Sequence, residues 1–156
     1  MSSFHLREFQ PGDAPAFRTL NAEWIERYFR LEAADEAVLS NPESVILDRG
    51  GRIFFALRDG EFLGCCALIR VTDDEFELAK MAVTSAAQGT GLGRALMTAA
   101  IEAARRDGVR RIVLETNSAM IPAVRLYESA GFRRIPAGQV HPSAYARSDV
   151  AMELLL

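Results

Sequence analysis

The chain has few residues that could hold a metal ion or form a disulfide. Its 156 residues include two cysteines and two histidines, and none of them has a spacing typical of zinc ligands. Cys65 and Cys66 are adjacent in an apolar run, where strand side chains point to opposite faces and are not easily bridged. We therefore expect no metal, and we interpret both cysteines as reduced packing residues, because their neighbours supply no cation or base to activate a thiol.

The sequence also lacks an excess of positive charge and a long hydrophobic segment. Its formal net charge of −3 and pI near 5.5 argue against the basic face that non-specific nucleic-acid binding requires. No run approaches the roughly 20 apolar residues that cross a bilayer, and the first residues do not resemble a secretory signal. We expect a cytoplasmic protein with neither a nucleic-acid nor a membrane partner.

Length and composition, with 49% hydrophobic and 25% charged residues, are typical of one globular domain over residues 1–156. Asp13 follows Pro11-Gly12 as a possible helix cap, and Asp59-Gly60 is a pair favoured in tight hairpin turns. The expected elements in chain order are a strand at 4–9, a helix after residue 13, a weaker helix at 31–39, a short helical turn from 41, antiparallel strands at 52–58, 61–71 and 76–83, a helix from 91 that ends before 108, a strand at 111–116, a helix at 122–130 and a strand from 150.

A loop between a strand and a helix carries the clearest chemical signal. Gly89, Gly91 and Gly93 leave backbone amides unobstructed where the helix begins, which makes an anion site. The loop lacks the Gly-Lys-Ser/Thr of a P-loop, and Arg94 stands where the Rossmann fingerprint needs glycine. The strand, loop, helix and next strand form a βαβ crossover, so we expect a parallel strand pair here. Glycine-rich turns are common, and the loop by itself could be structural.

The loop and its surroundings resemble the GNAT superfamily of N-acetyltransferases. Gln88-x-x-Gly91-x-Gly93 matches the family signature Gln/Arg-x-x-Gly-x-Gly/Ala, and the similarity runs from about residue 76 to 132, including Met81-Ala82-Val83 and the segment from Leu126-Tyr127 to Gly131-Phe132. The resemblance implies an α/β (α+β) fold with a mixed, twisted and splayed sheet of about six or seven strands flanked by helices. It also implies acetyl-CoA as co-substrate, bound by Met81, Ala82 and Val83 along the pantetheine and by Gln88, Gly89, Thr90, Gly91, Leu92, Gly93 and Arg94 at the pyrophosphate.

Three residues are candidates for catalysis. The resemblance implies that Tyr127 protonates the CoA thiolate, although its place on an apolar helix stripe also suits a packed aromatic. Glu115 aligns with a position that some members use as a base, and Glu77 could act as a base through a water. If neither does, the amine arrives already deprotonated. Many members bind pantetheine with an Asn seven residues before the tyrosine, but Met120 stands there; Asn117 could reach cofactor or acceptor instead, or serve only as a turn residue.

The acceptor site is expected between the first helix, with Glu23 and Trp24, and the loop at 139–147, with His141 and Tyr145. Glu23 would suit a cationic amine and Arg147 an acidic one, and the sequence does not choose between them. Trp24 could equally be a core residue and His141 an exposed loop residue.

The resulting hypothesis is an N-acetyltransferase in which the amine of a small molecule or peptide attacks acetyl-CoA directly. A CoA-binding sensor or interaction module that has lost turnover would have the same fold. A nucleotide-binding domain that uses the same loop is a weaker alternative. The apolar tail strand makes a homodimer a further possibility.

Overall fold

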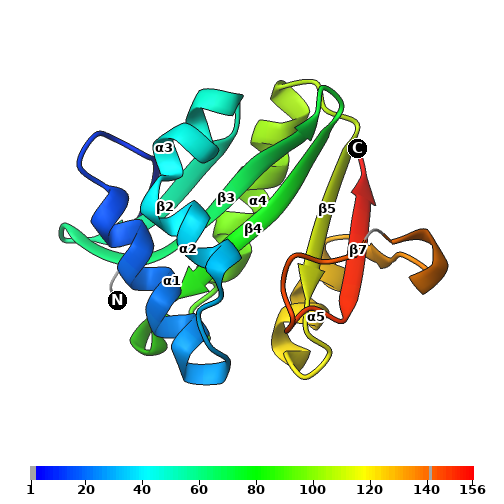
Figure 1. The fold of residues 1–156 in the computed structure, drawn as a ribbon. Coiled ribbons are helices and arrows are strands. Elements are labelled where there is room, and N and C mark those ends of the chain that lie inside the picture. The colour runs from blue at the N-terminus through cyan, green and yellow to red at the C-terminus, as the bar shows by residue number, and fades with distance from the viewer. Residues whose placement is uncertain (1–2, 141) are drawn as a thin grey trace.

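The computed structural model describes residues 3–140 and 142–156, so His141 of the expected acceptor loop lies outside the described residues. Within these residues the chain forms one seven-stranded sheet in the order β1-β2-β3-β4-β5-β7-β6 (Figure 1). The strands are β1 His5–Glu8, β2 Arg52–Arg58, β3 Glu61–Thr72, β4 Glu75–Val83, β5 Arg111–Thr116, β6 Arg133–Arg134 and β7 Val150–Leu155. The helices are α1 Ala14–Tyr28, α2 Ala33–Ser40, α3 Pro42–Val45, α4 Leu92–Arg106 and α5 Ile121–Ser129.

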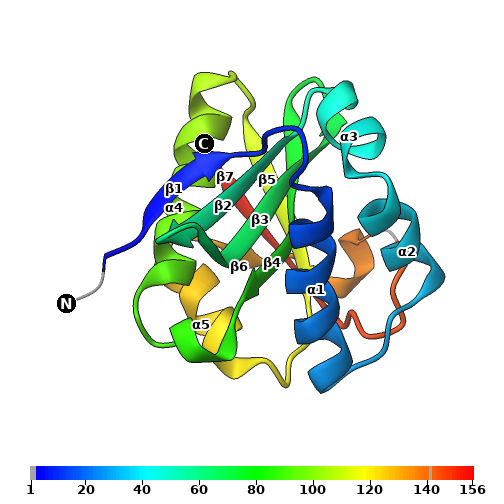
Figure 2. The same cartoon turned by 90° about the vertical axis from the view of Figure 1, so that its left-hand side faces the viewer.

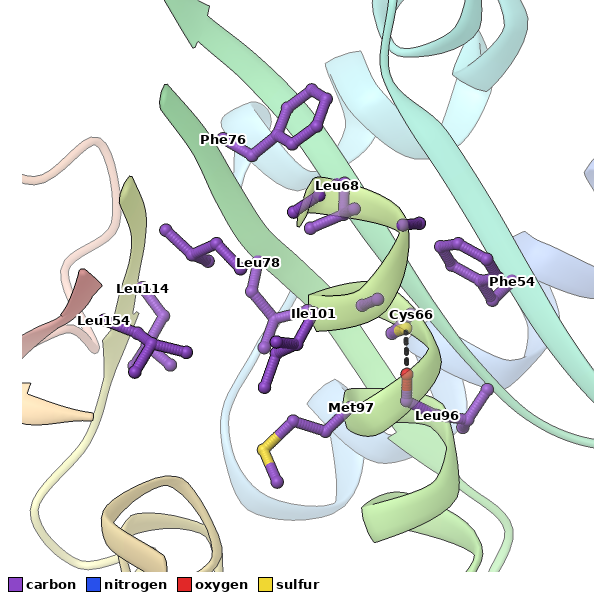
Figure 3. Close-up of a cluster of buried hydrophobic side chains, with 14 of the residues drawn as sticks. Phe54, Cys66, Leu68, Phe76, Leu78, Leu96, Met97, Ile101, Leu114 and Leu154 are labelled. Carbon is purple, nitrogen blue, oxygen red and sulfur yellow. Dashed lines mark hydrogen bonds between the residues drawn. The ribbon is translucent and has the colours of Figure 1, made fainter. Parts of the chain in front are cut away.

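Helices cover both faces of the sheet. Figure 2 shows α1, α2 and α3 on one side of the strands and α4 and α5 on the other. The core under α4 includes Leu96, Met97 and Ile101, which pack on Phe76 and Leu78 of β4 (Figure 3). A second core lies on the opposite face and contains Phe17 and Leu20 of α1. Strand alternation thus assigns the side chains of β5 and of the first part of β4 to one face or the other.

The two cysteines are buried packing residues, as expected. Both are free thiols, and Cys65 belongs to the core beneath α1 whereas Cys66 belongs to the core beneath α4. The Cys66 thiol donates to the carbonyl of Leu96 at 3.7 Å (Figure 3). Their opposite orientations exclude a disulfide between them.

Most expected elements are confirmed, with two differences. Asp13 stands at the position before α1, but its carboxylate makes no capping bond; it accepts from the Arg7 guanidinium at 2.6 Å and from the Gln10 amide at 2.8 Å. The two-residue strand β6, which pairs with β7, was not expected. Asp59 and Gly60 do form the tight turn between β2 and β3, and both have positive φ.

The sheet is splayed between β4 and β5. These parallel strands pair at three positions only, from Glu75 opposite Arg111 to Glu77 opposite Val113. Beyond Glu77 the register of β4 against β3 shifts, and Lys80 adopts a positive φ of 53°. Such a bulge bends a strand away from its neighbour. Meanwhile β5 stays paired with β7 as far as Thr116, so the two halves of the sheet diverge.

Candidate active site

A cavity of about 650 Å³ occupies the splay between β4 and β5. Its walls come from α1, the second half of β4, the glycine-rich loop, the end of β5, α5 and the segment before β7. Most of the expected site residues meet here: Trp24, Glu77, Met81, Val83, Gln88, Gly89, Gly91, Leu92, Gly93, Arg94, Glu115, Asn117, Tyr127 and Tyr145. Among the described residues no helix is long and apolar enough to cross a membrane, and no cluster of potential metal ligands is found.

The glycine-rich loop forms an open cradle at the start of α4. The first helical hydrogen bond runs from the Ala95 amide to the Gly91 carbonyl, so the amides of residues 92–94 have no partner within the helix. Gly89 and Gly91 have φ of 78° and 84°, which L side chains rarely adopt, and a Cβ at either would meet no atom within 4 Å. Free amides, a helix N-terminus and open space fit a pyrophosphate.

Two of the expected cofactor residues do not line the cavity. The Thr90 hydroxyl donates to the Ala87 carbonyl at 2.5 Å, which closes the loop, and Thr90 does not line the cavity. Ala82 is buried against β3 opposite Cys65 and does not line it either. Met81 and Val83 do line the cavity, on the stretch of β4 that has lost its pairing with β5. The free backbone edge there can pair with an extended amide-containing chain.

The two candidate bases lie on the face of the sheet that α1 and α2 cover. Because Phe76, Leu78, Ile112 and Leu114 belong to the core beneath α4, alternation directs Glu77 and Glu115 to the opposite face. Burial is the main cause that raises the pKa of Glu77 from 4.5 to about 7. The neighbouring charge of Glu115 raises the pKa further, and Lys80 lowers it by a smaller amount. Glu115 accepts a hydrogen bond from the Ser143 hydroxyl at 3.1 Å. A carboxyl with a pKa near neutrality is suited to accept a proton.

Tyr127 approaches the cavity from the other face. It lies on α5, packs at the edge of the core beneath α4 and meets the Phe132 ring edge-on at 6.0 Å. Burial raises the pKa of Tyr127 from 10.0 to about 12, with a smaller contribution from Cys66. Its hydroxyl therefore stays protonated near neutral pH and can donate a proton. Thus one face of the splay carries a carboxyl with a pKa near neutrality and the other a tyrosine that stays protonated.

Asn117 lines the cavity, but its amide is held by the chain. Its Nδ2 donates to the Arg147 carbonyl at 2.7 Å and its Oδ1 accepts from the Ala119 amide at 2.8 Å. The first bond fastens the end of β5 to the segment before β7, and the second closes a turn within the loop after β5. A side-chain contact of Asn117 to cofactor or acceptor stays a prediction, and it would use the second hydrogen of Nδ2 or the second lone pair of Oδ1.

Three of the expected acceptor residues, Trp24, Tyr145 and Arg147, reach the cavity. Trp24 and Tyr145 line it, together with Tyr28 and Phe29 at the end of α1. Glu23 is exposed on α1 beside a small separate hollow and does not line the cavity.

The sequence did not indicate a buried ionic cluster beside the cavity. Asp35 on α2 is fully buried, and its carboxylate accepts from Lys80 Nζ at 2.7 Å and from both terminal nitrogens of Arg147 at 2.6 and 2.8 Å. Arg147 also reaches Glu32 at 3.2 Å. Burial by itself would raise the pKa of Asp35. The hydrogen bonds from Arg147 and Lys80 outweigh this effect and lower the pKa to about 2. Lys80 and Arg147 line the cavity.

The thiols do not take part in this arrangement. Burial raises the pKa of Cys65 to about 12 and that of Cys66 well above its ordinary value. Neither residue lines the cavity. A thiol that stays protonated is a poor nucleophile, so an acyl-cysteine route has no support.

Comparison with known proteins agrees with this geometry. A model of the acetyltransferase (GNAT) family matches residues 15–132. Rat N-acetyltransferase 8B is 31% identical over 106 residues, which are 65% of this chain and 47% of that protein. The chain spans less than half the length of the curated relatives that it matches first.

Solved structures have the same fold. An acetyltransferase of the GNAT family from Staphylococcus aureus superposes with a TM-score of 0.89 at 20% identity, covering 98% of this chain and 99% of that one. A Salmonella typhimurium protein solved with its cofactor acetyl-CoA superposes with a TM-score of 0.75 at 24% identity, covering 99% and 94%.

Proposed function

The chain belongs to the acetyltransferase (GNAT) family, and on this premise we propose that it is an N-acetyltransferase that uses acetyl-CoA to acetylate a primary amine of a small molecule or peptide by direct attack. The observation that carries the proposal is the position of the cavity. It connects a phosphate cradle on one side of the sheet with a carboxyl of raised pKa on the other.

Acetyl-CoA, when bound, supplies the acetyl group as a thioester. The free amides of residues 92–94, with Arg94 nearby, hold the pyrophosphate, and the unpaired edge of β4 at Met81 and Val83 binds the pantetheine. These contacts place the thioester in the splay. There β4 and β5 are not hydrogen-bonded to each other and leave room for it.

Proton transfer is divided between the two faces. As the amine nitrogen bonds to the acyl carbon, Glu77 accepts the amine proton, directly or through a water, and Glu115 keeps the proton affinity of Glu77 high. Tyr127 gives its proton to the sulfur as the carbon–sulfur bond breaks, and the two protons balance when Glu77 and Tyr127 return to their resting forms through solvent. The products are an N-acetylated amine and free CoA.

The direct test is release of CoA from acetyl-CoA in the presence of a panel of amines, with thermal unfolding measured in parallel. We expect acetyl-CoA to raise the unfolding temperature and at least one amine to release CoA. Stabilisation by acetyl-CoA with no turnover by any amine would identify a CoA-binding sensor. Stabilisation by ATP or NAD, with none by acetyl-CoA, would refute the proposal.

A further inference from the structure

The charges and rings around the acceptor end of the cavity point to one class of amine. Resting on the function proposed above, we propose that the acceptor is an arylalkylamine: a primary amine on a short chain, attached to an aromatic ring and without a carboxylate beside the nitrogen. The side chains that surround this end of the cavity carry the inference in three steps.

The two cations that line this end of the cavity are already neutralised. Lys80 and Arg147 share the buried carboxylate of Asp35, and Arg147 also binds Glu32. Two cations and two carboxylates leave the cluster with no net charge. The Lys80 side chain is only 5% exposed, so little of its ammonium group is open to a ligand. A carboxylate on the acceptor would find no free cation here.

The carboxylates that line the same end have no cation as a bonding partner among the described residues. Glu115 accepts from the Ser143 hydroxyl, and burial together with the charge of Glu115 raises the pKa of Glu77 to about 7, so about half of Glu77 is ionised near neutral pH. Both side chains point to the α1 and α2 face, where the acceptor enters. An ammonium group is attracted by this pair, whereas a second carboxylate would be repelled. This arrangement favours Glu77 and Glu115, and not Arg147, as the determinant of acceptor charge.

Aromatic rings form a large part of the remaining acceptor wall, beside Ile25 and Ile69. Trp24 lies 6.1 Å from the rings of both Tyr28 and Phe29, and all three line the cavity. Tyr145, in the segment before β7, also lines the cavity, but Lys80 and Arg147 already contact its ring, each 4.5 Å from the ring centroid. The open aromatic surface therefore comes from α1 and the residue after it. Tyr28 is 47% exposed although it is aromatic, which leaves its ring free for contact. Such walls favour a flat apolar group over a flexible polyamine chain.

Binding can be measured separately from turnover, because Trp24 is the single tryptophan of the chain and lines the cavity. The probes are phenethylamine and phenylalanine, which differ only by the carboxylate, with putrescine as the non-aromatic amine. We expect phenethylamine to change the Trp24 fluorescence saturably, and its kcat/KM to exceed that of phenylalanine by roughly 100-fold or more. Equal or better binding and turnover of phenylalanine or putrescine would overturn the inference while leaving the acetyltransferase function intact.

If no amine releases CoA, the proposed function fails, and the fluorescence titration still decides the inference. Tight binding of phenethylamine with none of phenylalanine would support the acceptor class, and the reverse would overturn it.

The ionic cluster gives a second test with a matched control. Asp35→Asn should leave the charge of Arg147 without its main partner. The ratio of kcat/KM for phenethylamine to that for phenylalanine should then fall roughly tenfold. Glu36→Gln is the control on the same helix, because Glu36 pairs with Arg18 outside the cavity. Should Asp35→Asn fail to fold, Glu32→Gln removes the other carboxylate from Arg147 and should narrow the preference in the same direction. If the ratio is unchanged in the folded variants, the carboxylates of this cluster do not keep the charge of Arg147 from the acceptor, and that step of the inference is wrong.

Discussion

The raised pKa of Glu77 makes a quantitative expectation for activity against pH. With a pKa of about 7, about 1% of Glu77 is ionised at pH 5, so kcat/KM should fall about 100-fold between its plateau and that pH. The amine itself loses its proton at much higher pH, which adds a separate rise to the profile of kcat/KM against pH. The limb of the profile near pH 7 therefore reports Glu77. Glu77→Gln should remove the limb near pH 7 and lower the plateau by about 10²- to 10⁴-fold.

The same shift predicts how stability depends on pH. Because the folded-state pKa of about 7 exceeds the ordinary 4.5, the folded protein binds this proton more tightly than the unfolded chain. The contribution to stability is present below pH 4.5 and is lost as pH rises through 7. At ~1.4 kcal/mol for each tenfold change in proton affinity, the loss is about 3 kcal/mol. Glu77→Gln should flatten the free energy of unfolding over this window by up to that amount.

Glu75→Gln is the matched control, because Glu75 lies on the same strand and face, pairs with Arg111 and does not line the cavity. It should keep the limb near pH 7. Steady-state rates from pH 5 to 9 and denaturant unfolding over the same range provide both measurements. Persistence of the limb in Glu77→Gln would refute the role of Glu77 as proton acceptor.

Three further outcomes are expected. Glu115→Gln should move the acid limb to lower pH, because the charge of Glu115 raises the pKa of Glu77; a limb that stays in place would exclude this coupling. Tyr127→Phe should lower kcat about 10- to 100-fold at an unchanged thermal-shift response to acetyl-CoA, and an unchanged kcat would remove it as the acid. Gly91→Ala should cost about 1 kcal/mol of stability and weaken acetyl-CoA binding, whereas Gly12→Ala, equally left-handed at φ +98°, should cost stability alone; equal binding losses would contradict a special role for the loop.

The elements and the glycine-rich turn before α4 were predictable because their causes are local. Apolar periodicity predicts α4, and Gly91 at its start adopts a positive φ of 84°, a conformation that favours glycine. The side of the sheet to which Glu77 and Glu115 point also follows from strand alternation once the core face is known. The strand β6 is two residues long, which is too short for any periodicity to be read from the sequence.

The ionic cluster could not be predicted from the sequence, because its members are far apart along the chain. Asp35 meets Lys80 45 positions later and Arg147 112 positions later, and only the folded sheet brings them together. Nor could the sequence choose between Glu23 and Arg147 as the charge that selects the acceptor. The structure exposes Glu23 outside the cavity and pairs Arg147 with Asp35, so the acceptor-selecting charge proposed above is assigned to the carboxylates of β4 and β5.

Burying charged side chains costs desolvation free energy that their mutual attraction does not always recover. Replacing such a group of charges by apolar residues of similar size is often neutral or stabilising, so stability alone does not explain Asp35, Lys80 and Arg147. Their position suggests another reason: Lys80 lies at the bulge that opens the splay, and Arg147 lies in the segment that carries Tyr145. Pairing both with one buried carboxylate fixes two walls of the cavity while keeping their charges from the acceptor. In the acceptor site proposed above, the same pairing weakens the repulsion of an ammonium group by Lys80 and Arg147.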